Sequence, residues 1–265
     1  MSENSGSDQQ SISPDELPFV APCRKLDSGA PLRWLKQGWQ DLRRAPRQSL
    51  AYGVVLLLLS YAISLTAYHF GSIYLLIAML SGFIFLGPVM AIGLYSISRQ
   101  LQQGRNPELG YCLREERRHL GNELVFTVIL LIVFLIWARS ASMVHVFFPA
   151  EGGQEIADLA LFLAVGTSVG TIFAAVIFCA SAFSLPFIMD RKVDVVTAVI
   201  SSVNAVLRNK MVMLIWSSLI VVLILVGFAT AFLGLAVLLP LIGHATWHAY
   251  QDTIDASAWP KHMDE

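Results

Sequence analysis

Two histidines near the end of the chain are the residues best placed to do chemistry. His244 and His248 lie in the stretch LLPLIGHATWHAYQD, which runs from Leu238 to Asp252. Because residues four apart share one face of a helix, the two imidazoles would point in the same direction. Imidazole is a common ligand for haem iron, copper and zinc. Two rings on one helix cannot hold a single haem from both sides, so a bound metal would need ligands from other helices.

Asp190 is the best candidate for such a further ligand. It lies four residues after Pro186, just as His244 lies four residues after Pro240. The sequence leaves two interpretations open. In one, His244, His248 and Asp190 share a transition metal or contribute to a haem site. In the other, which we favour, no cofactor binds and these side chains are polar contacts at the edge of a membrane.

Aromatic and histidine side chains at the ends of membrane spans commonly act as interface anchors, because each has an apolar body and a polar tip. The residues predicted to anchor this protein in that way are Trp34, Trp39, Trp247 and Tyr250.

The composition indicates a membrane protein. The 265 residues are 55% hydrophobic and only 14% charged, whereas soluble domains carry about 25% charged residues. The apolar residues gather in runs that reach the roughly 20 residues a helix needs to cross a bilayer. The sequence therefore predicts an all-α, polytopic membrane helical bundle in contact with the lipid bilayer. Six spans are predicted, at about residues 50–69, 73–96, 124–145, 159–188, 211–228 and 231–250. Five spans with a re-entrant segment are the alternative.

The distribution of positive charge predicts the orientation, because Lys and Arg gather in cytoplasmic loops. Of the 18 Lys and Arg residues, only Arg139 falls on the opposite side of the predicted membrane. We expect a multi-pass protein of the bacterial inner membrane with both termini in the cytoplasm. Residues 1–30 are predicted to be a disordered cytoplasmic tail, residues 31–252 the membrane domain and residues 253–265 a second cytoplasmic tail.

The six spans are expected to form three hairpins, each preceded by a short amphipathic helix on the cytoplasmic membrane surface. Before the first span, apolar residues recur at helical spacing beside basic residues, a pattern suited to a membrane surface. These apolar residues are Leu32, Leu35, Trp39 and Leu42.

The outgoing span of each hairpin carries one proline, and a proline inside a helix kinks it. The predicted kinks are at Pro88, Pro186 and Pro240. The fourth span also carries small residues four apart, which let two helix backbones approach closely. This predicted packing face consists of Gly166, Gly170 and Ala174.

Motifs that carry catalysis are missing from the sequence. The apolar cores of the predicted spans contain no Asp, Glu, Lys or Arg, which disfavours an ion-coupled transporter. No phosphate-binding loop, nucleophile motif or zinc-protease motif occurs in a supporting context. We therefore expect no enzymatic activity and no nucleic-acid partner, and instead a structural, assembly or regulatory protein with a membrane-protein partner or a second copy of itself. The alternatives are a small haem- or metal-binding accessory subunit of a respiratory oxidase and a permease for a neutral or lipid-like solute.

Four segments carry a resemblance to a known family: PLRWLKQGWQDLRRAPRQSLAYG, FLGPVMAIGLYSISRQLQQGRNP, FSLPFIMDRKVDVVTAV and LLPLIGHATWHAYQD. From Pro31 to Asp252 the chain resembles bacterial integral membrane proteins grouped as domain of unknown function 2189. Some members bear a provisional cytochrome c oxidase subunit label. The resemblance implies a membrane protein but no activity. A catalytic oxidase subunit needs more inward-facing histidines than this chain offers, so the label would fit an accessory or assembly subunit only.

Overall fold

The computed structural model describes residues 18–69, 90–108, 124–140 and 156–261, together with Gly121 and Met143. Every regular element within these ranges is a helix, and extended contacts are limited to two isolated bridges. The predicted all-α class is therefore confirmed. The helices are α1 (Ala30–Arg44), α2 (Pro46–His69), α4 (Ile92–Gln102), Leu124–Ser140, α6 (Ile156–Ser181), α7 (Ser184–Asp190), α8 (Val195–Arg208), α9 (Lys210–Ala229) and α10 (Leu235–Thr253).

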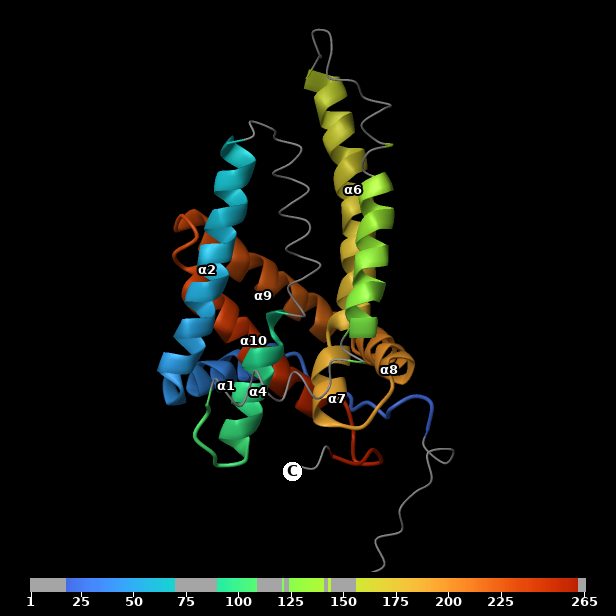
Figure 1. Ribbon diagram of the computed structural model, residues 1–265. Coiled ribbons are helices and arrows are strands. Elements are labelled where there is room, and N and C mark those ends of the chain that lie inside the picture. The colour runs from blue at the N-terminus through green and yellow to red at the C-terminus, as the bar shows by residue number, and fades with distance from the viewer. Residues whose placement is uncertain are drawn as a thin grey trace, which may run out of the picture.

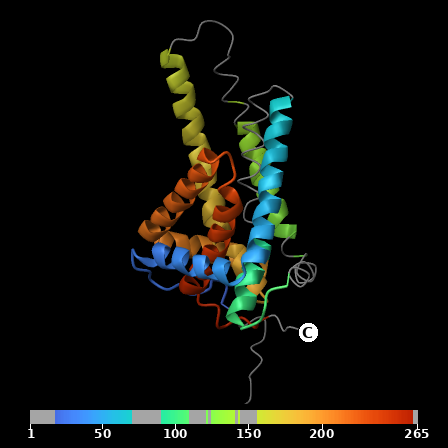
Figure 2. The ribbon, with the colours of Figure 1, turned by 90° about the vertical axis from the view of Figure 1, so that its left-hand side faces the viewer.

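The molecule has a base from which the longest helices rise. Figure 1 shows α2 and α6 standing on the same side of this base, with the chain running upward along α2 and downward along α6, and α1, α4, α7 and α8 gathered at their lower ends. α1 runs across this base rather than along α2, as the second view also shows (Figure 2). α10 descends obliquely through the middle and contacts α1, α2, α4, α7 and α9, so it is the central element of the base.

Three helical segments are long and apolar enough to cross a membrane: Pro46–Thr66, Ala164–Asp190 and Lys210–Ala229. Leu124–Ser140 is a shorter apolar helix at the start of the predicted third span. The predicted second span, at about 73–96, lies mostly outside the described residues. These lengths and compositions agree with a polytopic membrane protein.

α1 is amphipathic, and its best-buried face meets other helices. Pro31 occupies the first turn, where its missing N–H costs nothing, and Arg43 and Arg44 in the last turn complement the helix dipole. Trp34 and Gly38 lie on the buried face together with Leu42. The contacts of this face are mainly to α10.

α9 and α10 are separate helices, as predicted for this apolar stretch, and a tight turn joins them at Thr230–Gly234. Ala231 and Phe232 adopt positive φ angles of 51° and 68°, which are uncommon for residues with a Cβ. Tyr61 of α2 holds the turn in place, because its hydroxyl donates to the carbonyl oxygen of Ala231 at 2.6 Å. Its ring also packs edge-on against Phe232.

The predicted proline kinks have different outcomes. Pro240 lies inside α10. Pro186 lies in the first turn of α7, and the helix is interrupted at Ala182–Phe183, one turn before it. This agrees with the missing N–H of Pro186, which leaves the carbonyl four residues earlier without its helical donor. Pro88 lies outside the described residues.

Segments at both ends of the described chain close the base. The N–H of Arg24 donates to the carbonyl of Thr253 at 2.9 Å, and the N–H of Asp255 donates to the carbonyl of Pro22 at 2.8 Å. Residues 18–29, which we call the N-terminal strap, thus pair with the end of α10, although they were predicted to belong to a disordered tail. Residues 254–261 are likewise packed, with Trp259 only 2% exposed.

Candidate functional site

The polar side chains of α10 form a buried cluster with α1, α2 and α4. His244 is completely buried. Its Nε2 lies 2.9 Å from the hydroxyl of Ser49 on α2, and its Nδ1 lies 2.8 Å from the hydroxyl of Ser98 on α4. A neutral imidazole has one donor and one acceptor nitrogen, and a hydroxyl can serve either role. Two serines therefore satisfy the ring without any charge, and neither nitrogen is left over for a metal.

One turn further along α10, His248 pairs with an acid on α1. Its Nε2 lies 2.8 Å from Oδ2 of Asp41, and the two side chains are only 11% and 5% exposed. Nδ1 of His248 faces the amide nitrogen of Gln102 on α4 at 3.4 Å. The same amide accepts a hydrogen bond from the indole N–H of Trp247 at 3.0 Å. The contact between His248 and Asp41 thus lies where α1, α4 and α10 meet.

Asp190 lies elsewhere in the base, with partners of its own. Its Oδ2 accepts the hydroxyl hydrogen of Tyr250 at 2.9 Å and the Nε–H of Arg191 at 3.0 Å. Arg191 in turn donates to the carbonyl of Trp259 at 2.8 Å. This contact therefore ties the end of α7 to α10 and to the segment that follows it.

The structure does not bring Asp190 together with His244 and His248. Within the described ranges, no group of three or more His, Cys, Asp or Glu side chains is arranged to hold a metal. Asp190, which the repeat relates to His244, contacts Tyr250 and Arg191 instead, and the acid beside His248 is Asp41. A signal for Asp41 was present in the sequence: it is an acid on the helical stripe of Trp34, Gly38 and Leu42. An acid on an otherwise apolar stripe commonly has a buried partner.

Three of the four predicted interface anchors lie in the protein interior. Trp34 and Trp247 are 0% exposed and Tyr250 is 1% exposed, whereas Trp39 is 44% exposed. Trp34 packs edge-on against Trp216 of α9, with ring centroids 5.6 Å apart. Its indole N–H donates to Asp252 at 2.9 Å. Buried aromatic rings whose polar tips find partners stabilise helix packing, so these three rings hold the base together.

The closest approaches of a glycine to the backbone of another helix involve other glycines than the predicted ones. A Cβ added at Gly38 of α1 would lie 2.7 Å from the backbone nitrogen of Ala245. A Cβ added at Gly53 of α2 would overlap the carbonyl oxygen of Ala236. At Gly166 and Gly170 of α6, no atom of another part of the described chain lies within 4 Å of such a Cβ. α10 is the packing partner of both close glycines.

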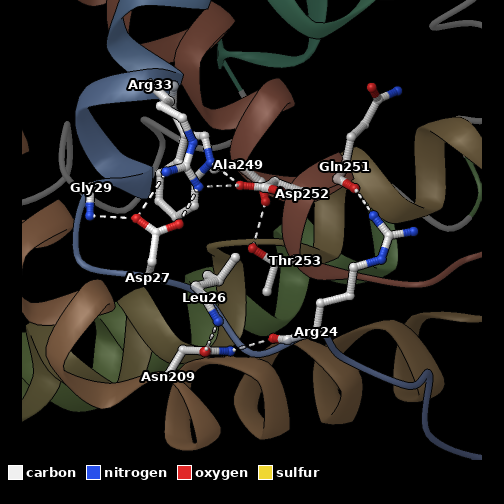
Figure 3. A network of polar contacts seen from close by, with 11 residues as sticks. Arg24, Leu26, Asp27, Gly29, Arg33, Asn209, Ala249, Gln251, Asp252 and Thr253 are labelled. Carbon is white, nitrogen blue, oxygen red and sulfur yellow. Dashed lines mark hydrogen bonds and ion pairs between the residues drawn. The ribbon is translucent and has the colours of Figure 1, made fainter.

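A second polar network fixes the N-terminal strap (Figure 3). The guanidinium of Arg33 donates to both carboxylate oxygens of Asp27, at 2.8 and 2.6 Å. This hydrogen bonding is the main reason that the pKa of Asp27 is lowered from 3.8 to about 2. Arg33 also approaches Asp252 at the end of α10, at 3.7 Å. The strap is therefore attached to α1 and α10 through one arginine.

Asn209, at the junction of α8 and α9, holds the other side of the strap. Its side-chain amide accepts the N–H of Leu26 at 3.0 Å and donates to the carbonyl of Arg24 at 3.1 Å. Figure 3 shows these contacts beside those of Arg33. The amide replaces the backbone pairing that an extended segment would find in a sheet.

Together these contacts make a rigid polar base. Among the described residues, every buried side-chain nitrogen and oxygen has a hydrogen-bond partner. A fully satisfied polar network in a low-dielectric interior fixes one arrangement of the helices, because each broken bond would leave a buried group unpaired. The role that these hydrogen bonds can perform is to hold the helices of the base in one orientation.

The all-helical fold, with apolar helices long enough to cross a bilayer, defines a polytopic integral membrane protein. Residues 75–190 match a family described as "Predicted integral membrane protein (DUF2189)". This is the family that the sequence resembles, and the matched segment includes α4, α6 and α7. No curated protein and no solved structure matches the chain. The family description carries no activity, substrate or partner.

Proposed function

We propose that this protein is a non-enzymatic, multi-pass protein of the bacterial inner membrane that acts as a structural, assembly or regulatory partner of another membrane protein. The observation that carries the proposal is the contrast between the base and α6. The buried polar groups of the base that the structure describes are paired within the chain, whereas α6 exposes apolar side chains over much of its length. Leu161 is 54% exposed, Ile172 64% and Val176 51%. Gly166 and Gly170 lie on another face of α6, where small residues would let a partner helix approach closely.

The proposed topology has six spans in three hairpins, with both termini in the cytoplasm. The pairing of the N-terminal strap with residues 254–261 supports an even number of crossings, because both segments lie on one side of the molecule. The alternative with five spans would place them on opposite sides. The position of Lys and Arg supports the cytoplasmic assignment of that side.

Reporter fusions test the topology directly. Fusions after His69 and after Glu151 should report the periplasm, and fusions after Arg105 and Asp190 the cytoplasm. A cytoplasmic signal from either of the first two, or a periplasmic signal from either of the others, would contradict the six-span arrangement.

Affinity purification from native membranes in mild detergent, after crosslinking, tests the partner role. The expected result is a membrane protein, or a second copy of this chain, that co-purifies reproducibly. The test variant is Gly166→Leu. It adds a large side chain to the glycine face of α6 and should reduce recovery of the partner. A protein that remains solitary in repeated preparations would count against the role.

The same purified sample separates the alternatives. A Soret band or stoichiometric metal would instead favour a haem- or metal-binding accessory subunit of a respiratory oxidase. Solute uptake that depends on the protein in a deletion strain would favour a permease for a neutral or lipid-like solute.

A further inference from the structure

α1 has an outer face that the rest of the described chain leaves uncovered. Its inner face is fixed on α10 through Trp34, Gly38 and Asp41. Residues at i, i+4, i+7 and i+11 share one face of a helix. On the side opposite the buried stripe, that spacing brings together Leu32, Lys36, Trp39 and Arg43, all of them exposed. We call these four residues the outer stripe of α1.

The outer stripe combines two apolar and two cationic side chains. Leu32 is 63% exposed and Trp39 is 44% exposed, which are large values for apolar side chains on a helix that is otherwise well packed. Leu, Trp, Lys and Arg together are typical of helices lying in the headgroup region of a bilayer. There the apolar parts enter the lipid while the cationic groups reach the phosphates.

Negative charge that could neutralise the outer stripe is absent from α1 itself. Its only acid is Asp41, which is buried on the other face and paired with His248. Neither Lys36 nor Arg43 has an ion pair with any part of the chain that the structure describes. The cations of the outer stripe therefore remain available to an external anion.

The position of α1 brings the outer stripe to the membrane surface. α1 crosses the base at the foot of α2, one of the helices able to span a bilayer, and it connects to that helix through Ala45 alone. In Figure 2, α1 lies at the front of the molecule, below α9 and level with the lower end of α2. A helix at the end of a span and across its axis lies at headgroup depth.

We propose that the outer stripe of α1 is a binding surface for the headgroups of anionic phospholipids in the leaflet that surrounds the base. Lys36 and Arg43 contact the lipid phosphates, while Leu32 and Trp39 insert at the boundary between headgroups and acyl chains. This inference goes beyond the proposed function, because it names a ligand class and requires only that the protein is inserted in a membrane.

Tryptophan quenching tests the proposal on the full chain. Four of the six tryptophans are no more than 2% exposed, so quenchers in lipid reach them poorly. The signal of Trp39 is obtained as the difference between the wild-type protein and Trp39→Phe. The proteins are reconstituted in phosphatidylcholine vesicles with a minority of phosphatidylglycerol. The acyl chains of one or the other lipid carry bromine, at the same mole fraction of brominated lipid.

The expected result is stronger quenching of Trp39 by brominated phosphatidylglycerol than by brominated phosphatidylcholine. Each cation near a lipid surface strengthens association about fivefold, so the preference should fall by up to roughly 25-fold in the double variant Lys36→Gln, Arg43→Gln. The matched control, Lys261→Gln, removes an exposed cation outside α1 and should leave the preference unchanged.

Two results would overturn the proposal. Equal quenching of wild-type Trp39 by the two brominated lipids would show a neutral membrane contact. Quenching by neither would show that protein or water covers the outer stripe. The comparison of the two lipids requires only the wild-type protein and Trp39→Phe. This substitution changes an exposed ring, so we expect the variant to fold.

Discussion

The substitution Gly53→Ala tests how α2 and α10 are packed. Pro240 has no N–H, so the carbonyl of Ala236, four residues earlier in α10, loses its helical donor. That carbonyl oxygen approaches Gly53 so closely that an added Cβ would overlap it. The obstacle is backbone, which cannot rotate away as a side chain can. We therefore expect α2 to be displaced from α10 in the variant.

The magnitude follows from a comparison with Gly166→Ala. Both glycines lie inside long helices, so replacing either with alanine gains the same helix propensity, about 1 kcal/mol. At Gly166 no atom of another described segment lies within 4 Å of the new methyl group, and only this gain remains. At Gly53 the added methyl overfills a packed contact, which typically costs about 1–3 kcal/mol. The two variants should therefore differ by about 1–3 kcal/mol, with Gly53→Ala the less stable.

Thermal unfolding in detergent, followed by circular dichroism, measures this difference. For chains of this size, 1 kcal/mol shifts Tm by about 2–4 °C, so the two variants should be separated by several degrees. If Gly166→Ala is destabilised as much as Gly53→Ala, the reasoning is refuted. The predicted packing face of Gly166, Gly170 and Ala174 would then be as tightly packed as the contact at Gly53.

Three further predictions concern polar contacts, two in the base and one at the α9–α10 turn. Asp41→Ala should destabilise the protein by about 1–3 kcal/mol, because it leaves the buried Nε2 of His248 without its hydrogen-bond partner. A double-mutant cycle with His248→Ala should show coupling between the two residues in chemical denaturation. The pKa of Asp27 is about 2 when folded, below its ordinary 3.8, so its contact with Arg33 should be complete above pH 3.8 and lost as the pH falls through about 2. Carboxyl NMR titration measures that pKa, and Asp27→Asn should remove the corresponding pH dependence of proteolysis in the N-terminal strap. Tyr61→Phe should cost about 1 kcal/mol in the same unfolding assay, because it deletes the hydrogen bond that holds the α9–α10 turn, and an unchanged stability would contradict that role.

The sequence was a good guide wherever one property of a segment decides its structure. Hydrophobic runs identify α2, α6 and α9, because length and polarity alone determine whether a helix can cross a membrane. The division of residues 210–253 into two helices followed from length, since one straight helix would be about twice the thickness of the hydrocarbon layer. The position of Pro240 inside α10 was predicted because the apolar run continues on both sides of this proline.

The candidate site was harder to predict, because helical spacing shows which residues share a face but not which element covers that face. His244 and His248 do share a face, yet their partners are Ser49, Ser98 and Asp41, which come from three other helices. No pattern within α10 could identify them. The same limit explains the glycines: close approach depends on the facing backbone, so the regular spacing in α6 was no guide to Gly53.

The anchor prediction shows a related limit. Trp34 and Trp39 lie in the same short helix and have the same side chain, but α10 covers one and leaves the other exposed. Helical spacing places the two residues on different faces of α1, but it does not show which of these faces another helix covers. Only the direction in which α1 leaves α2, set at Ala45, decides which tryptophan faces the protein.

The contact between α1 and α10 has a consequence for biogenesis. These two helices are separated by 190 residues of sequence, so α1 leaves the ribosome long before its partner exists. At about 5–20 residues per second, the delay is roughly 10–40 s. During that interval the face of Trp34 and Gly38 has no α10 to cover it, and Asp41 has no His248. The base is therefore completed last, and nascent chains stopped before α10 expose to chaperones and proteases the surface that the finished protein buries.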